Sequence, residues 1–243
     1  MRYFIEVAYK GTKYAGFQIQ QNANTIQAEV EKALQIYYRQ VFSLTGSSRT
    51  DAGVHAHQNF FHFDADFLIV SAMVVYHINA ILPNDIVVLG IQQVKDNAHC
   101  RFDAISRTYK YRIYNFKNPF LEETASFSPS ILDIALLNQA GSLLLKHTNY
   151  QSFSKKNTQV FTYECKITES TWAEDNGVTM YTITGNRFLR GMVRGLVGTM
   201  ILVAKRKITV ANFKEILQAQ NSSDTDFSTA ARGLTLHKVR FGE

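Results

Sequence analysis

Cysteine, proline and long apolar runs are scarce in this chain of 243 residues. Its two cysteines, Cys100 and Cys165, lie far apart in the sequence, which favours a reducing, cytoplasmic setting. Its apolar runs stay below the roughly 18 residues that a membrane-spanning helix needs. The N-terminus starts directly with strand-like alternation and lacks the apolar stretch of a signal peptide. The sequence therefore predicts a cytoplasmic protein without a membrane segment.

Motifs for common cofactors are also missing. The chain has no Gly-rich phosphate loop, no cysteines at metal-ligand spacing and no dinucleotide fingerprint. His55, His57 and His62 lie close together in sequence and could indicate a metal enzyme, but no carboxylate or cysteine completes a ligand set. We expect neither a metal nor a cofactor.

The composition is that of an ordinary globular protein with a basic surplus. Hydrophobic residues make up 46% of the chain, and the net charge is +6 with a pI of about 9.2. A surplus of this size favours a polyanionic partner such as nucleic acid. A basic enzyme with a small-molecule substrate remains an alternative on charge alone.

Hydrophobic periodicity predicts alternating strands and helices. We expect strands at residues 2–9, 41–44, 59–63, 85–91, 107–113, 160–171, 178–185 and 233–239. We expect helices that begin near residues 25, 71, 133, 188 and 209. This order predicts an α+β fold of two comparable halves, residues 1–104 and 105–243, each with a small sheet and helices on one side. The two sheets would join into one mixed, mainly antiparallel sheet, with a cleft between the halves.

The segment 46–56, GSSRTDAGVHA, is the strongest candidate for a reactive site. Small residues let its backbone take unusual dihedral angles and approach a partner closely. Within it stand one carboxylate, Asp51, and one guanidinium, Arg49. A carboxylate beside a cation on a loop between strands can present a reactive acid to a ligand. The alternative is a simple turn, in which Asp51 satisfies local backbone donors.

Two further segments combine aromatic and basic residues. The loop at 10–18, KGTKYAGFQ, could contact a nucleic-acid backbone and stack bases, or it could turn its aromatic residues inward. On the strand from Arg107, one face carries Arg107, Tyr109, Tyr111 and Ile113. Its tyrosines could stack a base, or they could belong to a half-buried sheet face.

Five stretches together resemble the TruA-type tRNA pseudouridine synthases. The most specific is RTDAGVHA at 49–56, and the others are YAGFQIQ at 14–20 with the TIQAEVEKAL helix start, LPNDIVV at 82–88, RTYKYRI at 107–113 and FLRGMVRGLVG at 188–198. The resemblance covers nearly the whole chain and extends to GLTL at 233–236. Departures occur at Lys10, Phe17, the basic run 204–207 and Ala230-Ala231, where the family usually has Asp, Trp, a glycine-bearing stretch and Ala-Pro.

The resemblance implies two ferredoxin-like halves with a central active-site cleft and a homodimer that binds tRNA. The reaction would turn uridine into pseudouridine at positions 38, 39 and/or 40 of the anticodon stem-loop, with no cofactor. Asp51 would be the catalytic residue, either as nucleophile on the sugar or as base at C2′.

The resemblance also implies roles for four binding residues. Arg194 would be the cation that keeps the carboxylate of Asp51 ionised. Tyr109 would stack on the base, Arg49 would replace the extruded base in the RNA stack, and Leu234 would wall the pocket. A catalytically silent RNA-binding protein of the same fold is the alternative.

Overall fold

The computed structural model describes residues 1–69, 71–156 and 160–242. Contacts divide the chain into two compact units, the first made of Met1–Ile105 with Thr235–Glu243 and the second of Ser106–Leu234. The first unit is therefore built from both ends of the chain. The predicted halves, 1–104 and 105–243, stay a prediction, and the last strand is grouped with the first unit.

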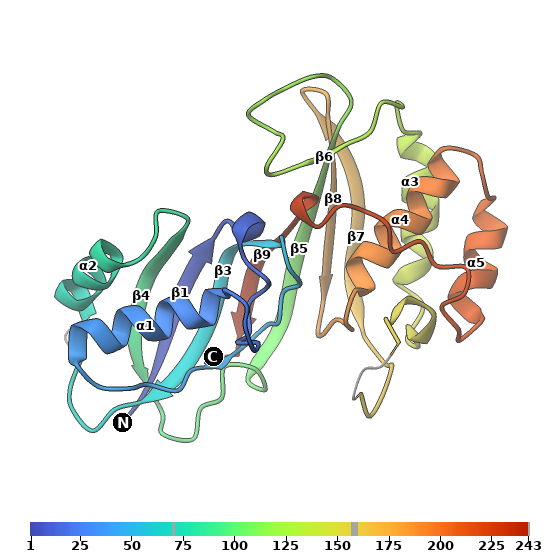
Figure 1. Ribbon diagram of the computed structural model, residues 1–243. Helices are drawn as coiled ribbons and strands as arrows, with labels where there is room; N and C mark the ends of the chain where they lie inside the picture. Colours follow the sequence, from blue (N-terminus) through green and yellow to red (C-terminus); the bar gives the residue numbers. More distant parts are fainter. Residues whose placement is uncertain (70, 157–159, 243) are drawn as a thin grey trace. The chain divides into compact units, whose positions relative to one another are not determined.

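A mainly antiparallel sheet and two helices form the first unit (Figure 1). Its elements in chain order are β1 (Arg2–Tyr9), α1 (Ile26–Tyr38), β2 (Thr45–Gly46), β3 (His55–Asp64), α2 (Ser71–Ile81), β4 (Ile86–Val94) and β9 (Leu234–Phe241). β1 lies between β4 and β3 and is antiparallel to both, whereas β9 runs parallel to β3. The short 3₁₀ helix η1 (Gly11–Lys13) follows β1.

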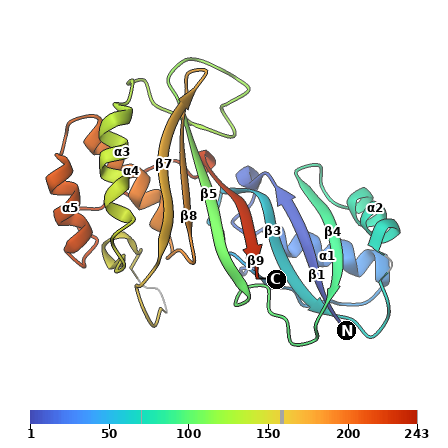
Figure 2. The ribbon, with the colours of Figure 1, turned by 180° about the vertical axis from the view of Figure 1, so that it is seen from behind.

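Helix α1 forms where the sequence predicts it. Thr25 is the N-cap, and its side chain accepts a hydrogen bond from the Ala28 backbone N–H. Ile26, Val30 and Leu34 are buried, so the apolar face that the 3.6-residue spacing predicts is the face that packs. In the views of Figures 1 and 2, α1 lies across one face of the sheet.

The second unit also consists of strands and helices. Its elements are β5 (Ala104–Tyr114), β6 (Ser126–Phe127), α3 (Ile134–Leu144), η2 (Gln151–Phe153), β7 (Ile167–Asp175), β8 (Val178–Gly185), α4 (Met192–Ala204), α5 (Val210–Gln218) and η3 (Ala231–Gly233). β8 lies between β5 and β7 and is antiparallel to both. Helix α3 packs on β7, and α4 and α5 pack on α3 (Figure 2). The predicted α+β class with mainly antiparallel strands is confirmed.

Three predicted element boundaries are wrong. Residues 41–44 form no strand, although Phe42 and Leu44 are buried, and the pairing with β3 starts only at Thr45. The strand expected from residue 160 begins at Ile167. The helix expected from residue 188 begins at Met192, because Gly191 takes a left-handed conformation with φ of 73° as its N-cap.

Every helix in the described ranges is too short or too polar to cross a membrane.

Candidate active site

The segment that carries Asp51 connects β2 to β3 and is packed tightly on the loop that follows β1. A Cβ at Gly11 would lie 2.0 Å from the Val54 carbonyl oxygen, and one at Gly16 would lie 2.9 Å from that of Thr50. The Phe17 N–H donates to the Thr50 carbonyl oxygen over 3.1 Å. Only glycine fits at these two positions, so the small residues of the loop at 10–18 serve close backbone contact.

Buried side-chain hydrogen bonds from β1 and β3 also hold this segment. The Tyr9 hydroxyl lies 2.8 Å from Thr50 Oγ1. Asn59 Nδ2 donates to the Tyr9 oxygen over 3.1 Å and to the Ser48 carbonyl oxygen over 2.8 Å. Ser48, Thr50 and Asn59 are all buried. The sequence offered one signal for this network, because Asn59 is a polar residue on the strand face that otherwise carries Phe61 and Phe63.

These buried hydrogen bonds fix the backbone on both sides of Arg49 and so determine how far the two charged residues of the segment are exposed. Arg49 is exposed between the buried Ser48 and Thr50, and Asp51 is half-buried. The side chain of Asp51 is thus not turned into the core of its unit. A carboxylate on a rigid, partly exposed backbone can meet a ligand without first reorganising the loop.

The aromatic residues of the loop at 10–18 point inward. Phe17 is 1% exposed and stacks on Phe61 with ring centroids 4.3 Å apart. Tyr14 is 5% exposed and donates to the carboxylate of Asp85, and burial together with this bond raises the pKa of the Tyr14 hydroxyl. The possibility that these rings stack RNA bases is therefore wrong, and the inward alternative holds. Lys10 remains exposed.

In the second unit, Tyr109 and Tyr111 share the buried face of β5, as the alternation predicts. Tyr111 is fully buried, and its hydroxyl donates to the Ala230 carbonyl oxygen over 2.9 Å. It supports η3, where a Cβ at Gly233 would lie 2.6 Å from the Tyr111 ring. Tyr109 is 8% exposed and meets Phe188 edge to face at 5.1 Å. Of the two tyrosines, Tyr109 is the remaining candidate for contact with a base.

Arg194 lies on α4 and binds the segment that leads to η3. Its Nε and Nη2 donate to the Thr229 carbonyl oxygen over 2.9 and 2.6 Å, and the Thr229 hydroxyl donates back to the Arg194 carbonyl oxygen over 3.0 Å. These bonds fix the plane of the guanidinium. Leu234 follows η3 and is 6% exposed. Within the second unit, Arg194 of α4 is thus hydrogen-bonded to the segment that leads to Leu234.

The glycines of α4 explain how this segment can come so close. A Cβ at Gly198 would lie 2.1 Å from the Asp226 carbonyl oxygen, and one at Gly195 would lie 2.8 Å from the Phe227 ring. Glycine inside a helix costs roughly 1 kcal/mol relative to alanine. These glycines permit close packing, since any side chain at Gly198 would collide with backbone.

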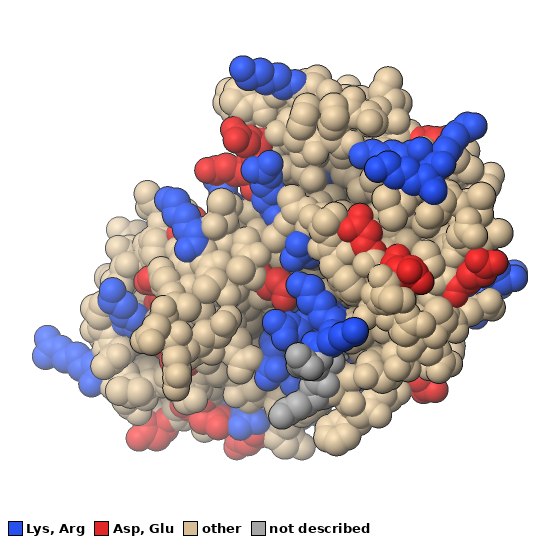
Figure 3. Space-filling view, turned by 45° about the vertical axis from the view of Figure 1, so that its right-hand side comes forward, with Lys and Arg blue, Asp and Glu red and all other residues tan. Residues whose placement is uncertain are grey.

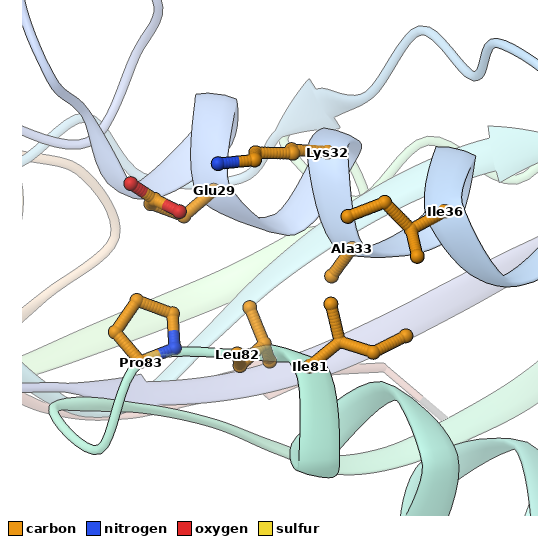
Figure 4. A pocket seen from close by; sticks show the side chains of 7 residues that line it. All are labelled: Glu29, Lys32, Ala33, Ile36, Ile81, Leu82 and Pro83. Atoms are coloured by element: carbon orange, nitrogen blue, oxygen red, sulfur yellow. The ribbon is translucent and has the colours of Figure 1, made fainter.

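A pocket of about 310 Å³ in the first unit lies between α1 and the end of α2 (Figure 4). Ala33 and Ile36 face Ile81 and Leu82 across it, and Glu29 and Lys32 stand at its rim. Its walls are mainly apolar, with one carboxylate and one ammonium group. The predicted site residues do not line it.

Comparison with known proteins decides the family. The model of the tRNA pseudouridine synthase family matches residues 5–103 and 144–242. The chain belongs to the tRNA pseudouridine synthase family. It is 41% identical over 242 residues to the tRNA pseudouridine synthase A of Porphyromonas gingivalis, covering 98% of this chain and 96% of that protein. It is 35% identical over 245 residues to the enzyme of that name from Staphylococcus aureus, covering 100% and 92%.

Membership in the synthase family confirms the predicted enzyme class, an isomerase. The candidate residues of this synthase fall in different parts of the match. Arg49 and Asp51 lie in the first matched stretch and Arg194 and Leu234 in the second, whereas Tyr109 lies between the two. Alignment with the relatives spans the whole chain and so includes Tyr109.

Proposed function

We propose that this synthase isomerises uridine to pseudouridine in the anticodon stem-loop of tRNA, at positions 38, 39 and/or 40, with Asp51 as the catalytic residue. The observation that carries the proposal is the Arg49-Thr50-Asp51 segment, whose buried anchors leave the guanidinium and the carboxylate accessible. The family membership supplies the reaction. The tRNA positions rest on the resemblance to TruA-type enzymes.

The reaction breaks the bond between C1′ and N1, turns the base and forms a bond between C1′ and C5. Asp51 can add to C1′ as a nucleophile, or it can take the proton from C2′ to give a glycal. Either route ends with loss of the proton from C5, so no electrons enter or leave. An ionised carboxylate is required at the start in both cases, and we assign Arg194 as the cation that favours it.

The other predicted residues would bind the substrate. A uridine inside a helix must leave the stack, which costs a few kcal/mol. Arg49 is exposed and would fill the vacated place in the RNA, which offsets part of that cost. Tyr109 would stack on the flipped base, and Leu234 would wall its pocket.

The surface charge suits an RNA substrate. The chain carries 26 Lys and Arg against 20 Asp and Glu, and Figure 3 shows Lys and Arg side chains collected into groups on the face drawn there. Contacts to phosphates release counterions, so the logarithm of the affinity should fall linearly with the logarithm of the salt concentration. A flat salt response of tRNA binding would contradict this part of the proposal.

The deciding experiment compares Asp51→Asn with the native enzyme on tRNA labelled with tritium at C5 of uridine. The substitution keeps the shape and removes the charge, so tritium release should disappear while tRNA affinity stays within a few fold. Asp66→Asn is the matched control, because Asp66 is an exposed aspartate elsewhere in the same unit. Release by the Asp51 variant at the native rate would contradict the assignment. No release by the native enzyme on any tRNA would favour the silent RNA-binding protein.

Two variants of Arg194 separate charge from geometry. Arg194→Met should move the acid limb of the pH–rate profile to higher pH, whereas Arg194→Lys keeps the charge and should leave that limb in place. Both variants lose the paired bonds to Thr229, so a limb that moves in both would show that the segment, not the cation, is responsible.

We also propose a cytoplasmic homodimer. Its support is a group of exposed apolar residues at and just before α2, Leu68 (67%), Met73 (66%) and Tyr76 (72%), together with two buried cysteines that suit a reducing compartment. Light scattering after size exclusion should give the mass of two chains. A mass of one chain at micromolar concentration would contradict the dimer.

A further inference from the structure

The three histidines of β3 fall into two groups. His55 is buried, and its Nδ1 accepts a hydrogen bond from the Gly11 N–H over 3.1 Å. His62 is buried with its Nδ1 3.2 Å from Cys100 Sγ. Both imidazoles therefore have structural partners inside the unit. His57, in contrast, is exposed and lies beside His237 of β9.

The parallel pairing of β3 and β9 places these two histidines together. His55 is paired with Thr235 and Ala56 with Leu236, so His57 and His237 come next on each strand. Their Nδ1 atoms lie 3.2 Å apart, and one of these nitrogens donates its proton to the other. Their ring planes cross at 66°.

This separation matches the bite of a tetrahedral metal ion. Zn²⁺ holds imidazole nitrogens at about 2.0–2.1 Å, which puts two tetrahedral ligands about 3.3 Å apart. A small rotation of each ring would turn both lone pairs toward one ion, which replaces the shared proton. Imidazole ligands suit Zn²⁺, Cu²⁺ and Ni²⁺, and they do not suit Mg²⁺.

We propose that His57 and His237 form a surface site for one divalent transition-metal ion of the zinc class. Within residues 1–69, 71–156 and 160–242 no third histidine, cysteine or carboxylate joins a metal-binding group, so water completes the coordination. The ion takes no part in the isomerisation proposed above. It links two strands whose residues are 180 positions apart in the chain, which stabilises the folded state by closing a long loop.

The test is calorimetric titration of Zn²⁺ into the tag-free, EDTA-treated full chain. The native protein should bind one ion per chain. His57→Gln and His237→Gln should each weaken that binding at least about tenfold, since each removes a direct ligand. Mutation of residues that only support a metal ligand already lowers metal affinity by about that factor. His77→Gln is the matched control, because His77 is exposed on α2 and should leave the affinity unchanged.

Thermal denaturation gives an independent measurement on the same proteins. Zn²⁺ should raise the melting temperature of the native chain and of His77→Gln, and it should not raise that of His57→Gln. Without metal, the native chain and the three variants should have the same melting temperature, which shows that each variant folds. Absence of Zn²⁺ binding by the native chain, or equal binding by all variants, would overturn the site and leave a hydrogen-bonded pair only. Neither result depends on catalytic activity.

Discussion

In the first unit buried side-chain hydrogen bonds, added to close backbone contacts at Gly11 and Gly16, hold the segment that carries Asp51. In the second unit the segment before Leu234 is held by close packing on the glycines of a helix. Tyr9 and Asn59 supply the bonds in the first case. Gly195 and Gly198 supply the space in the second, and Arg194 adds its bonds to Thr229. A hydrogen bond can be removed one atom at a time, but a glycine contact admits no added atom. Loss of one hydrogen bond should therefore be far less destabilising than a side chain added at a close glycine contact.

The largest effect is expected at Gly198. In Gly198→Ala the new Cβ would lie 2.1 Å from a backbone oxygen, so α4 and the segment at 225–227 must separate. We expect a loss of about 3 kcal/mol in the free energy of unfolding, the upper range for overpacking. Urea denaturation followed by circular dichroism measures it.

Gly90→Ala is the control for that experiment. A Cβ at Gly90 of β4 would meet no atom within 4 Å. The urea midpoint should move by less than the equivalent of about 0.5 kcal/mol. Equal losses for the two variants would mean that close packing is not what distinguishes the second unit.

Acid should weaken the first unit through His62. Burial, with the nearby His99, lowers the pKa of His62 to about 4, against about 6.5 in the unfolded chain. The unfolded chain therefore binds a proton at a pH where the folded chain does not. The stability that neutral, buried His62 contributes is complete above about pH 6.5 and declines as the pH falls toward 4. The free energy of unfolding should fall by about 2 kcal/mol between pH 7.5 and pH 5.

Hydrogen exchange at the two pH values can locate this effect. Peptides from β3 should lose protection at pH 5, after correction for intrinsic exchange rates, while peptides from β7 and β8 should keep theirs. In His62→Gln the difference between the two pH values should shrink. A uniform loss over both units would argue against His62 as its source.

The smallest effect is expected at Tyr9. Tyr9→Phe removes one hydroxyl that contacts Thr50 and Asn59 in the buried network. We expect a loss of about 1 kcal/mol in the free energy of unfolding, typical of one buried hydrogen bond. Ser43→Ala, which removes an exposed hydroxyl from the same unit, should change it by less than about 0.5 kcal/mol. If both variants unfold alike, the network does not hold the Asp51 segment.

Local periodicity predicted those features that depend on neighbours in sequence. The cap at Thr25 and the buried face of β5 follow from spacings of a few residues. The same method failed at 41–44, because Phe42 and Leu44 alternate and are buried without pairing to another strand. Alternation reports burial, and strand formation also needs a partner edge.

The candidate site shows the same limit. Asp51 could be chosen from its own segment, because the motif around it is specific. The residues that support it could not be chosen in this way, since Tyr9 and Asn59 lie on different strands. Tyr9 reaches Thr50, and Asn59 reaches Ser48, only through the register of β1 and β3. Likewise, nothing local in the loop at 10–18 tells whether Phe17 faces RNA or Phe61.

The return of the last strand to the first unit has a consequence for synthesis. β3 pairs with β9, which ends at Phe241, so the ribosome must translate the chain as far as β9 before the sheet of the first unit can acquire this strand. Until then the nascent polypeptide exposes backbone donors and acceptors along part of β3. Premature termination near residue 230 would therefore leave β3 with an unpaired, aggregation-prone edge, however well the rest of the chain had folded.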